Sequence, residues 1–165
     1  MKKLNVDLGS RSYPILIGEG LLQQAASFFE DRGISKRSPL LIVTDEHIAP
    51  FYLEPVTSIL EAGGFRVESY VAPSGEATKS LEYLENIITK ALHAGLDRNS
   101  AIVALGGGVI GDLAGFAAAS YMRGIRFVQI PTTILAHDSS VGGKVAVNHP
   151  SAKNIIGAFH QPELV

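Results

Sequence analysis

The glycine-rich turn at residues 106–112 is the feature of this sequence that most directly predicts ligand chemistry. Gly106, Gly108 and Gly111 have the spacing G-x-G-x-x-G, and they follow the apolar run 101–105, which is typical of a buried parallel strand. A backbone without Cβ atoms turns tightly and approaches a pyrophosphate closely, and the N-terminus of a following helix favours the negative charge. Glycines that merely let a strand and a helix pack closely have the same pattern, so the motif alone leaves both interpretations open.

The acidic residue that usually accompanies such a turn is missing. A dinucleotide-binding turn is normally followed about 20 residues later by an Asp or Glu for the ribose hydroxyl, but no acid stands between Leu113 and His137. An earlier apolar run, 40–44, ends in Asp45, where a carboxylate at the carboxyl edge of a sheet would do the same work. Asp45 is equally typical of a helix N-cap or first-turn acid ahead of Pro50.

Two further loops follow predicted strands and carry polar groups. The loop after Val71 holds Ser74, Gly75, Glu76 and Lys79, and the loop after Ile130 holds Thr132 and Thr133. Ligands of open α/β sheets bind at such strand ends. The alternatives are an acid at a helix start beside a solvated lysine in the first loop, and a pair of N-cap hydroxyls in the second.

The segment 138–154 concentrates cations and amides in what we expect to be loops. Lys144 follows a pair of glycines, and Lys153 and Asn154 follow a turn at Pro150. Loops of this composition either face water or hold an anion. Lys144 does not belong to a Walker A loop, because that spacing requires Ser or Thr where Val145 stands.

Alternating strand-like and helix-like runs must position these loops. Residues 4–8 and 13–17 predict a β-hairpin, and 21–29 predict a helix that ends at Gly33. Strand-like runs follow at 40–44, 65–71, 101–105 and 127–130, and helix-like runs at 50–60, 81–92 and 113–122. The run 81–92 has one apolar stripe by which it should pack on the sheet. We therefore expect an α/β fold, a Rossmann-like parallel sheet with helices on both faces and an N-terminal β-hairpin.

Composition excludes several classes of protein. The 165 residues fit one domain, and 46% hydrophobic against 18% charged residues predict a folded core. The absence of cysteine excludes disulfides, thiolate metal sites and cysteine nucleophiles. A net charge of −2 does not favour nucleic acid as a partner. We also expect no secretion signal, no membrane span and a cytoplasmic location.

The five histidines do not predict a metal site within these residues. His47, His93, His137, His149 and His160 show no H-E-x-x-H or other compact ligand spacing.

Taken as an ordered set, the motifs resemble the 3-dehydroquinate synthase family. The resemblance rests on the runs 106–116, 121–124, 131–133, 138–144 and 153–159, and is densest from Ser74 to Pro162. It implies a lyase of the shikimate pathway, and so of aromatic amino-acid biosynthesis, that uses NAD and a divalent metal, zinc or cobalt. Such an enzyme converts 3-deoxy-D-arabino-heptulosonate 7-phosphate into 3-dehydroquinate and phosphate by transient oxidation, phosphate elimination, reduction and aldol closure.

The resemblance also implies a role for each matching residue. Asp45 would meet the adenosine end of NAD, although His47 replaces an amide that some members have two positions later. The cofactor site would be completed by Ser74, Gly75, Glu76, Lys79, Gly107, Gly108, Asp112, Thr132 and Thr133. The substrate side would use Arg123, Lys144, Lys153 and Asn154 to hold phosphate or carboxylate groups, and Asp138 to orient a hydroxyl.

Family members are about twice as long as this chain, and their metal ligands, one Glu and two His, lie beyond Val165. We therefore expect a single NAD-binding domain over residues 1–165, inactive without the metal-binding half, and a homodimer acting on a small sugar phosphate when full length. The open alternatives are a stand-alone nucleotide-binding module, a subunit completed by a partner, a related sugar-phosphate cyclase such as 2-deoxy-scyllo-inosose synthase, and a metal-dependent polyol dehydrogenase.

Overall fold

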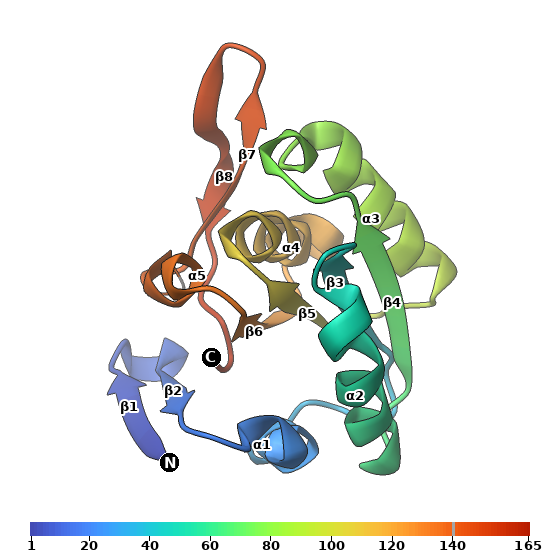
Figure 1. Ribbon diagram of the computed structural model, residues 1–165, viewed down its shortest axis with the longest axis vertical. Helices are drawn as coiled ribbons and strands as arrows, with labels where there is room; N and C mark the ends of the chain where they lie inside the picture. Colours follow the sequence, from blue (N-terminus) through green and yellow to red (C-terminus); the bar gives the residue numbers. More distant parts are fainter. Residues whose placement is uncertain (140) are drawn as a thin grey trace.

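A four-stranded parallel sheet forms the centre of the fold, in the order β4-β3-β5-β6 (Figure 1). Its strands are β3 (Leu40–Asp45), β4 (Val67–Ala72), β5 (Ala101–Gly106) and β6 (Arg126–Pro131). The computed structural model describes residues 1–139 and 141–165, without the side chains of 137–139. All of β5 and nearly all of β3 are buried, which explains why both strands are continuous apolar runs in the sequence.

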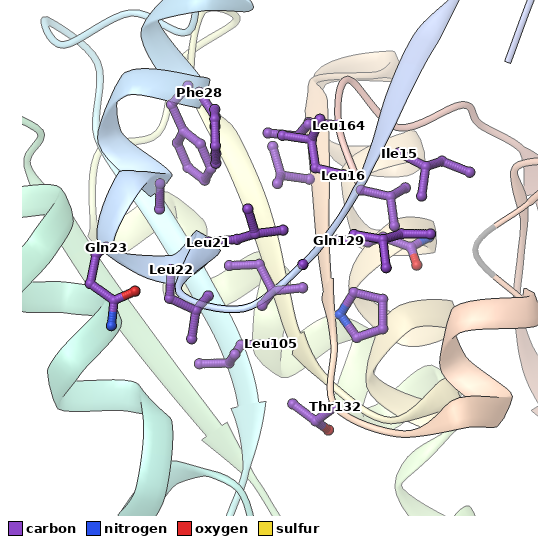
Figure 2. A pocket seen from close by; sticks show the side chains of 18 of the residues that line it. Ile15, Leu16, Leu21, Leu22, Gln23, Phe28, Leu105, Gln129, Thr132 and Leu164 are labelled. Atoms are coloured by element: carbon purple, nitrogen blue, oxygen red, sulfur yellow. The ribbon is translucent and has the colours of Figure 1, made fainter. Parts of the chain in front are cut away.

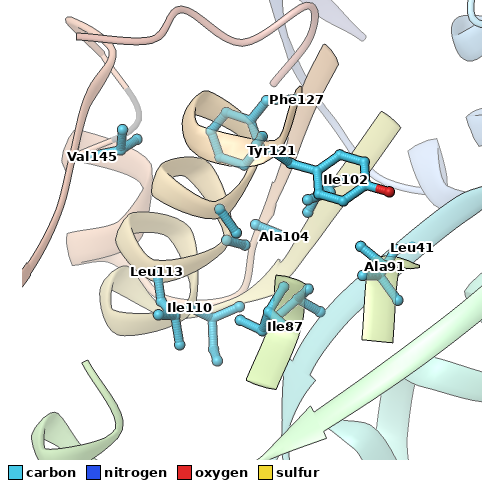
Figure 3. Packing of buried hydrophobic residues seen from close by; sticks show 14 of the residues in the cluster. Leu41, Ile87, Ala91, Ile102, Ala104, Ile110, Leu113, Tyr121, Phe127 and Val145 are labelled. Atoms are coloured by element: carbon cyan, nitrogen blue, oxygen red, sulfur yellow. The ribbon is translucent and has the colours of Figure 1, made fainter. Parts of the chain in front are cut away.

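Helices cover both faces of this sheet. On one face α1 (Ala25–Asp31), which follows the 3-10 turn η2 (Leu21–Gln24), and α2 (Ala49–Ala62) pack against Leu40 and Ile42. On the other face α3 (Leu81–His93) and α4 (Gly108–Ser120) pack against Leu41 and Val43 (Figure 3). Successive side chains of a strand point to opposite faces, so β3 serves both cores. The predicted Rossmann-like fold class is confirmed.

Helix α4 is buried on two sides, which its composition of small apolar residues allows. A hairpin of β7 (Lys144–His149) and β8 (Ala152–Phe159) packs against α4 in addition to the sheet. At Gly115, a Cβ would lie 2.3 Å from Val145 Cγ1 and 2.9 Å from the Phe127 ring. The hairpin therefore lies directly against the helix, and a helix that is apolar all round is one that is buried.

The β7–β8 hairpin corrects the interpretation of residues 138–154 as loops. Lys144 is the first residue of β7, and Lys153 and Asn154 lie within β8. A short helix, α5 (Ile134–Ser139), precedes the hairpin and was not predicted. These strands carry Lys, Asn, His and Gly among their apolar residues, so the period-two pattern that marks a strand is weak in them.

Other boundaries moved by smaller amounts. The helix expected at 113–122 begins at Gly108 and ends at Ser120, followed by the 3-10 turn η4 (Tyr121–Arg123). In α3 the apolar stripe is narrower than predicted: Ile87 and Ala91 are buried, whereas Leu81 and Leu92 are exposed.

The N-terminal β-hairpin is confirmed and is joined to the sheet by the chain end. β1 (Lys2–Val6) and β2 (Tyr13–Ile17) flank the 3-10 turn η1 (Gly9–Arg11). Residues 163–165 run between β2 and β6, with hydrogen bonds from Leu16 N to Val165 O (2.8 Å) and from Gln129 N to Leu164 O (3.0 Å). An apolar cavity of about 540 Å³, lined by Ile15, Phe28 and Leu164 among others, lies between this hairpin, α1 and β6 (Figure 2).

None of the helices in the described part of the chain has the length and apolarity that a bilayer crossing requires.

Candidate functional site

The predicted cofactor loops all meet at the carboxyl edge of the parallel sheet. Asp45 ends β3, Ser74 follows β4, Gly107 follows β5 and Thr132 follows β6. From the adjacent strands β3 and β5 the chain departs in opposite directions, toward β4 in one case and β6 in the other. Open α/β sheets bind their ligands at this kind of switch point, so the topology makes the end of β5, beside Gly107, the expected position of a ligand.

The glycines of the 106–111 turn have different structural roles. A Cβ at Gly106 would lie 2.8 Å from the Ile110 side chain, so Gly106 allows the strand and helix to pack closely. At Gly107 a Cβ would make an ordinary 3.5 Å contact with Thr133, so packing does not require glycine there. Gly107 is the N-cap of α4 and supplies no side chain to it. Among the described residues no side chain caps the first N–H groups of α4, which is the arrangement that the pyrophosphate interpretation requires.

Thr132 and Thr133 follow β6 near the N-terminus of α4, and their hydroxyl groups differ in hydrogen bonding. The Thr133 hydroxyl accepts a hydrogen bond from Ala136 N (3.1 Å), as expected of a residue that caps α5. The Thr132 backbone N–H donates to Gly106 O (3.0 Å), but its buried Oγ1 has no partner in the described part of the structure. Because buried hydroxyls are normally satisfied, Thr132 Oγ1 is suited to meet a bound cofactor.

Lys79 links the predicted cofactor side to the predicted substrate side. Its side chain is 6% exposed, and its Nζ donates to Asp112 Oδ2 (2.5 Å) and to Asn154 Oδ1. Burial raises the pKa of the Asp112 carboxyl above its ordinary value, while the ammonium groups of Lys79 and, more weakly, Lys144 act in the opposite direction. The structure thus brings together two residues assigned to the cofactor and one assigned to the substrate.

Glu76 makes a second link to the same hairpin. Its Oε1 accepts a hydrogen bond from Asn148 Nδ2 (2.8 Å) and lies 3.9 Å from Lys153 Nζ. An open cleft of about 600 Å³ lies between the loop that contains Glu76 and the tip of the β7–β8 hairpin. Glu76, Lys79, Asn148 and Lys153 are among the residues that line it. Asn148 was not predicted as a site residue, and its sequence signal is no stronger than that of any amide before a turn.

Asp45 and Ser74 belong to a third group of contacts at the ends of β3 and β4. Asp45 Oδ1 accepts hydrogen bonds from His47 N (2.9 Å) and Ile48 N (3.1 Å), so this carboxylate caps the turn that leads into α2. Ser74 Oγ donates to Glu46 Oε1 (3.2 Å). Asp45 therefore does cap this turn, as one of the two interpretations of the sequence expected. The cap uses one of its two carboxylate oxygens.

Arg123 lies apart from the Lys79–Asp112–Asn154 cluster, whereas the Lys144 ammonium is near enough to act on the pKa of the Asp112 carboxyl. Arg123 is in η4, which connects α4 to the start of β6, at the sheet edge opposite the cofactor loops. Lys144 is exposed at the base of the hairpin, paired with Phe159, and at about 3.3 Å per residue the turn after His149 is roughly 16 Å away. The side chain of Asp138, the remaining predicted catalytic residue, lies outside the described residues.

No group of three or more His, Asp or Glu side chains that could hold a metal ion occurs among the described residues.

Comparisons with known proteins find relatives over the whole chain. The family model described as "3-dehydroquinate synthase N-terminal" matches residues 69–165. Over all 165 residues the chain is 53% identical to a protein named 3-dehydroquinate synthase from Geobacillus kaustophilus (strain HTA426). It is 50% identical to another of that name from Geobacillus thermodenitrificans (strain NG80-2). In both cases it spans 45% of the relative's length.

Solved structures of sugar-phosphate cyclases have the same fold. A 2-deoxy-scyllo-inosose synthase complexed with carbaglucose-6-phosphate, NAD+ and Co2+ superposes with a TM-score of 0.91 at 29% identity, over 99% of this chain and 44% of the other. A 2-epi-5-epi-valiolone synthase from Streptomyces hygroscopicus subsp. jinggangensis 5008, with NAD+ and Zn2+ bound, gives 0.78 at 27% identity, over 96% of this chain and 43% of the other.

Proposed function

This chain belongs to the 3-dehydroquinate synthase family, and from this premise we propose that it is the NAD-binding part of a 3-dehydroquinate synthase. The complete enzyme would convert 3-deoxy-D-arabino-heptulosonate 7-phosphate into 3-dehydroquinate and phosphate in the shikimate pathway. The observation that carries the proposal is the Lys79–Asp112–Asn154 cluster, because it joins a cofactor loop to a strand bearing a second cation, Lys153. A simple nucleotide-binding module has no need of that second group.

The residues at the carboxyl edge fit a dinucleotide. Gly107 and Gly108 would admit the pyrophosphate to the N-terminus of α4, where free N–H groups and the helix dipole favour its charge. The unpartnered Thr132 Oγ1 would gain a partner there. When bound, NAD would supply the transient oxidation of a ring hydroxyl and the later reduction, so the overall reaction has no net redox change.

The hairpin residues would hold the substrate. Lys153 and Asn154, beside the cleft of about 600 Å³, offer a cation and an amide to the phosphate or carboxylate groups, and Lys144 would extend this set along β7. Positive groups placed in advance near a departing phosphate stabilise the charge that develops on it. Asp138 would orient a substrate hydroxyl. Arg123, at the opposite sheet edge, would need a contact that this arrangement does not provide.

The divalent metal has no fitting ligand set among the described residues. The metal would therefore be held by the part of the enzyme that the curated relatives have in addition, and we derive no step through it. For the same reason we propose that residues 1–165 alone do not turn over substrate. A homodimer is the assembly that we propose for the complete enzyme.

A second candidate is a related cyclase such as 2-deoxy-scyllo-inosose synthase. The TM-score of 0.91 to that enzyme favours it, whereas 53% identity to a protein named 3-dehydroquinate synthase favours the first proposal. The two differ in substrate, so a substrate panel separates them.

The test uses the polypeptide in the form that its source organism makes, which we call the native polypeptide. It measures the release of phosphate from the substrate. We expect release from 3-deoxy-D-arabino-heptulosonate 7-phosphate that requires both NAD and a divalent metal, and no reaction with glucose 6-phosphate. Turnover of glucose 6-phosphate alone would favour the related cyclase. NAD binding without any phosphate release would favour a binding module.

A further inference from the structure

Asn148 occupies the junction between the cofactor loop and the hairpin and has no role in the proposed function so far. It is half-buried near the end of β7. Its Nδ2 donates to Glu76 Oε1 (2.8 Å), its Oδ1 accepts from Asn154 N (2.9 Å), and its backbone N–H donates to Lys79 O (2.9 Å). One side chain thus contacts two residues that the proposal assigns to opposite sides of the site.

An irregularity in the hairpin directs Asn148 toward the cofactor loop. The strands are paired in register at Val147 and Ile156 and again at His149 and Ala152, so Asn148 alone faces residues 153–155. Bulges of this kind re-aim side chains and recur next to active sites. At this irregularity the Asn148 backbone N–H bonds to Lys79 O and not to β8, and the Asn148 side chain reaches Glu76.

The same irregularity holds Asn154 in an uncommon conformation. Asn154 has a φ of 56°, in the left-handed region that Asn adopts more readily than most residues. The Asn154 N–H is held by Asn148 Oδ1, and its own side-chain oxygen accepts from Lys79 Nζ. Lys79, Asn148 and Asn154 therefore form a closed ring of hydrogen bonds that fixes the Asn154 amide relative to the Lys79–Asp112 pair.

We propose that Asn148 is a positioning residue that couples the cofactor loop to the substrate-holding residues of β8. The inference rests on the proposed function, because it assumes that Glu76 serves the cofactor and Asn154 the substrate. An amide is required at this position, since it donates to a carboxylate with one atom and accepts from an N–H with the other. An Asp would keep the acceptor for Asn154 but place a second negative charge against Glu76.

The test compares Asn148→Ala and Asn148→Asp with the control Asn99→Ala in the native polypeptide. Asn99 is exposed in the turn before β5, at the end of the sheet opposite the cofactor loops, and its side chain makes no hydrogen bond in the described part of the structure. We expect both Asn148 variants to lower kcat/KM for the sugar phosphate by more than about tenfold, mostly through KM. Asn99→Ala should stay within about twofold.

A rescue experiment separates positioning from simple stabilisation of the hairpin. Glu76→Gln still accepts from Asn148, and it can also donate to an Asp at 148, which restores the hydrogen bond with reversed polarity. We therefore expect Asn148→Asp to lower kcat/KM by less than about threefold in the Glu76→Gln background, against more than about tenfold in the wild-type background.

The outcomes distinguish this inference from the function on which it rests. A wild-type native polypeptide that neither binds NAD nor releases phosphate overturns both. An active wild type whose Asn148 variants keep their kcat/KM, or lose only melting temperature, overturns the inference alone. Equal losses from Asn148→Asp in both Glu76 backgrounds also overturn it, because the contact with Glu76 then carries no coupling.

Discussion

The Lys79 ammonium and the Asp112 carboxylate lie 2.5 Å apart and fasten the start of α3 to the second turn of α4. Lys79 is 6% exposed and the Asp112 side chain 22%, so little water competes for either charge. Removing one member of such a pair leaves the other charge poorly solvated and without a partner. The stability lost in this way exceeds the net stability that the intact pair contributes.

Lys79→Met should therefore lower the free energy of unfolding by about 1–3 kcal/mol, because Met keeps the apolar stem and removes the charge. The control is Lys90→Met, which breaks the 2.8 Å pair of Lys90 with Glu68, where the side chains are 35% and 42% exposed. An exposed pair of this kind contributes about 0–1 kcal/mol. Urea denaturation of both variants gives the comparison, and equal losses would contradict the buried-pair interpretation.

The pH dependence of stability should carry the signature of Asp112. Burial raises its pKa in the folded protein above the ordinary value, which is about 3.9 in unfolded chains. The folded state then binds the proton more tightly, so the contribution of Asp112 to stability is complete at lower pH and is lost as pH rises through the raised pKa.

In the Lys79→Met background this effect should grow, because the interaction that opposes burial is gone. We expect Lys79→Met to lose stability relative to Lys79→Met/Asp112→Asn as pH rises from about 4 toward neutrality. Denaturation midpoints of the two variants across that range make the measurement. A difference that stays constant with pH, or that changes in the opposite direction, would show that burial does not dominate at Asp112.

The sequence predicted the parallel sheet because its buried strands, such as 101–105, are continuous apolar runs and its turns contain glycine. It did not predict the β7–β8 hairpin, because β7 and β8 pack by contacts between distant residues, such as Val145 with Gly115, that local patterns do not contain. The cofactor loops were predictable since all parallel strands end at one edge. The contacts of Asn148 with Glu76 and Asn154 were not predictable, because they depend on an irregularity in the register of the hairpin.

Close packing of α4 gives a prediction about its glycines. Gly115→Ala should cost about 1–3 kcal/mol of stability through overpacking, because the new Cβ would lie 2.3 Å from Val145 Cγ1. Gly111→Ala is the matched control in the same helix: its Cβ would make an ordinary 3.6 Å contact with Gln129 Oε1. That change should be neutral or stabilise by up to about 1 kcal/mol. Thermal unfolding compares them, and a well-tolerated Gly115→Ala would mean that the hairpin does not lie against the helix.

The charge of the cofactor gives a prediction in which stability and binding move in opposite directions. Gly107 is the N-cap of α4, with φ −77° and ψ −171°, a conformation open to any residue. Asp and Asn are both good N-caps, so Gly107→Asp and Gly107→Asn should each fold at least as stably as the wild type. Only Asp adds a negative charge where the pyrophosphate is proposed to bind.

We therefore expect Gly107→Asp to weaken NAD binding by the native polypeptide at least about tenfold more than Gly107→Asn does, as measured by isothermal titration calorimetry. Because screening weakens repulsion between solvent-accessible charges, the gap between the two variants should narrow from low salt to about 1 M salt. Equal affinities for NAD in the two variants would show that the charge at this helix end plays no part. A gap independent of salt would point to a steric rather than an electrostatic cause.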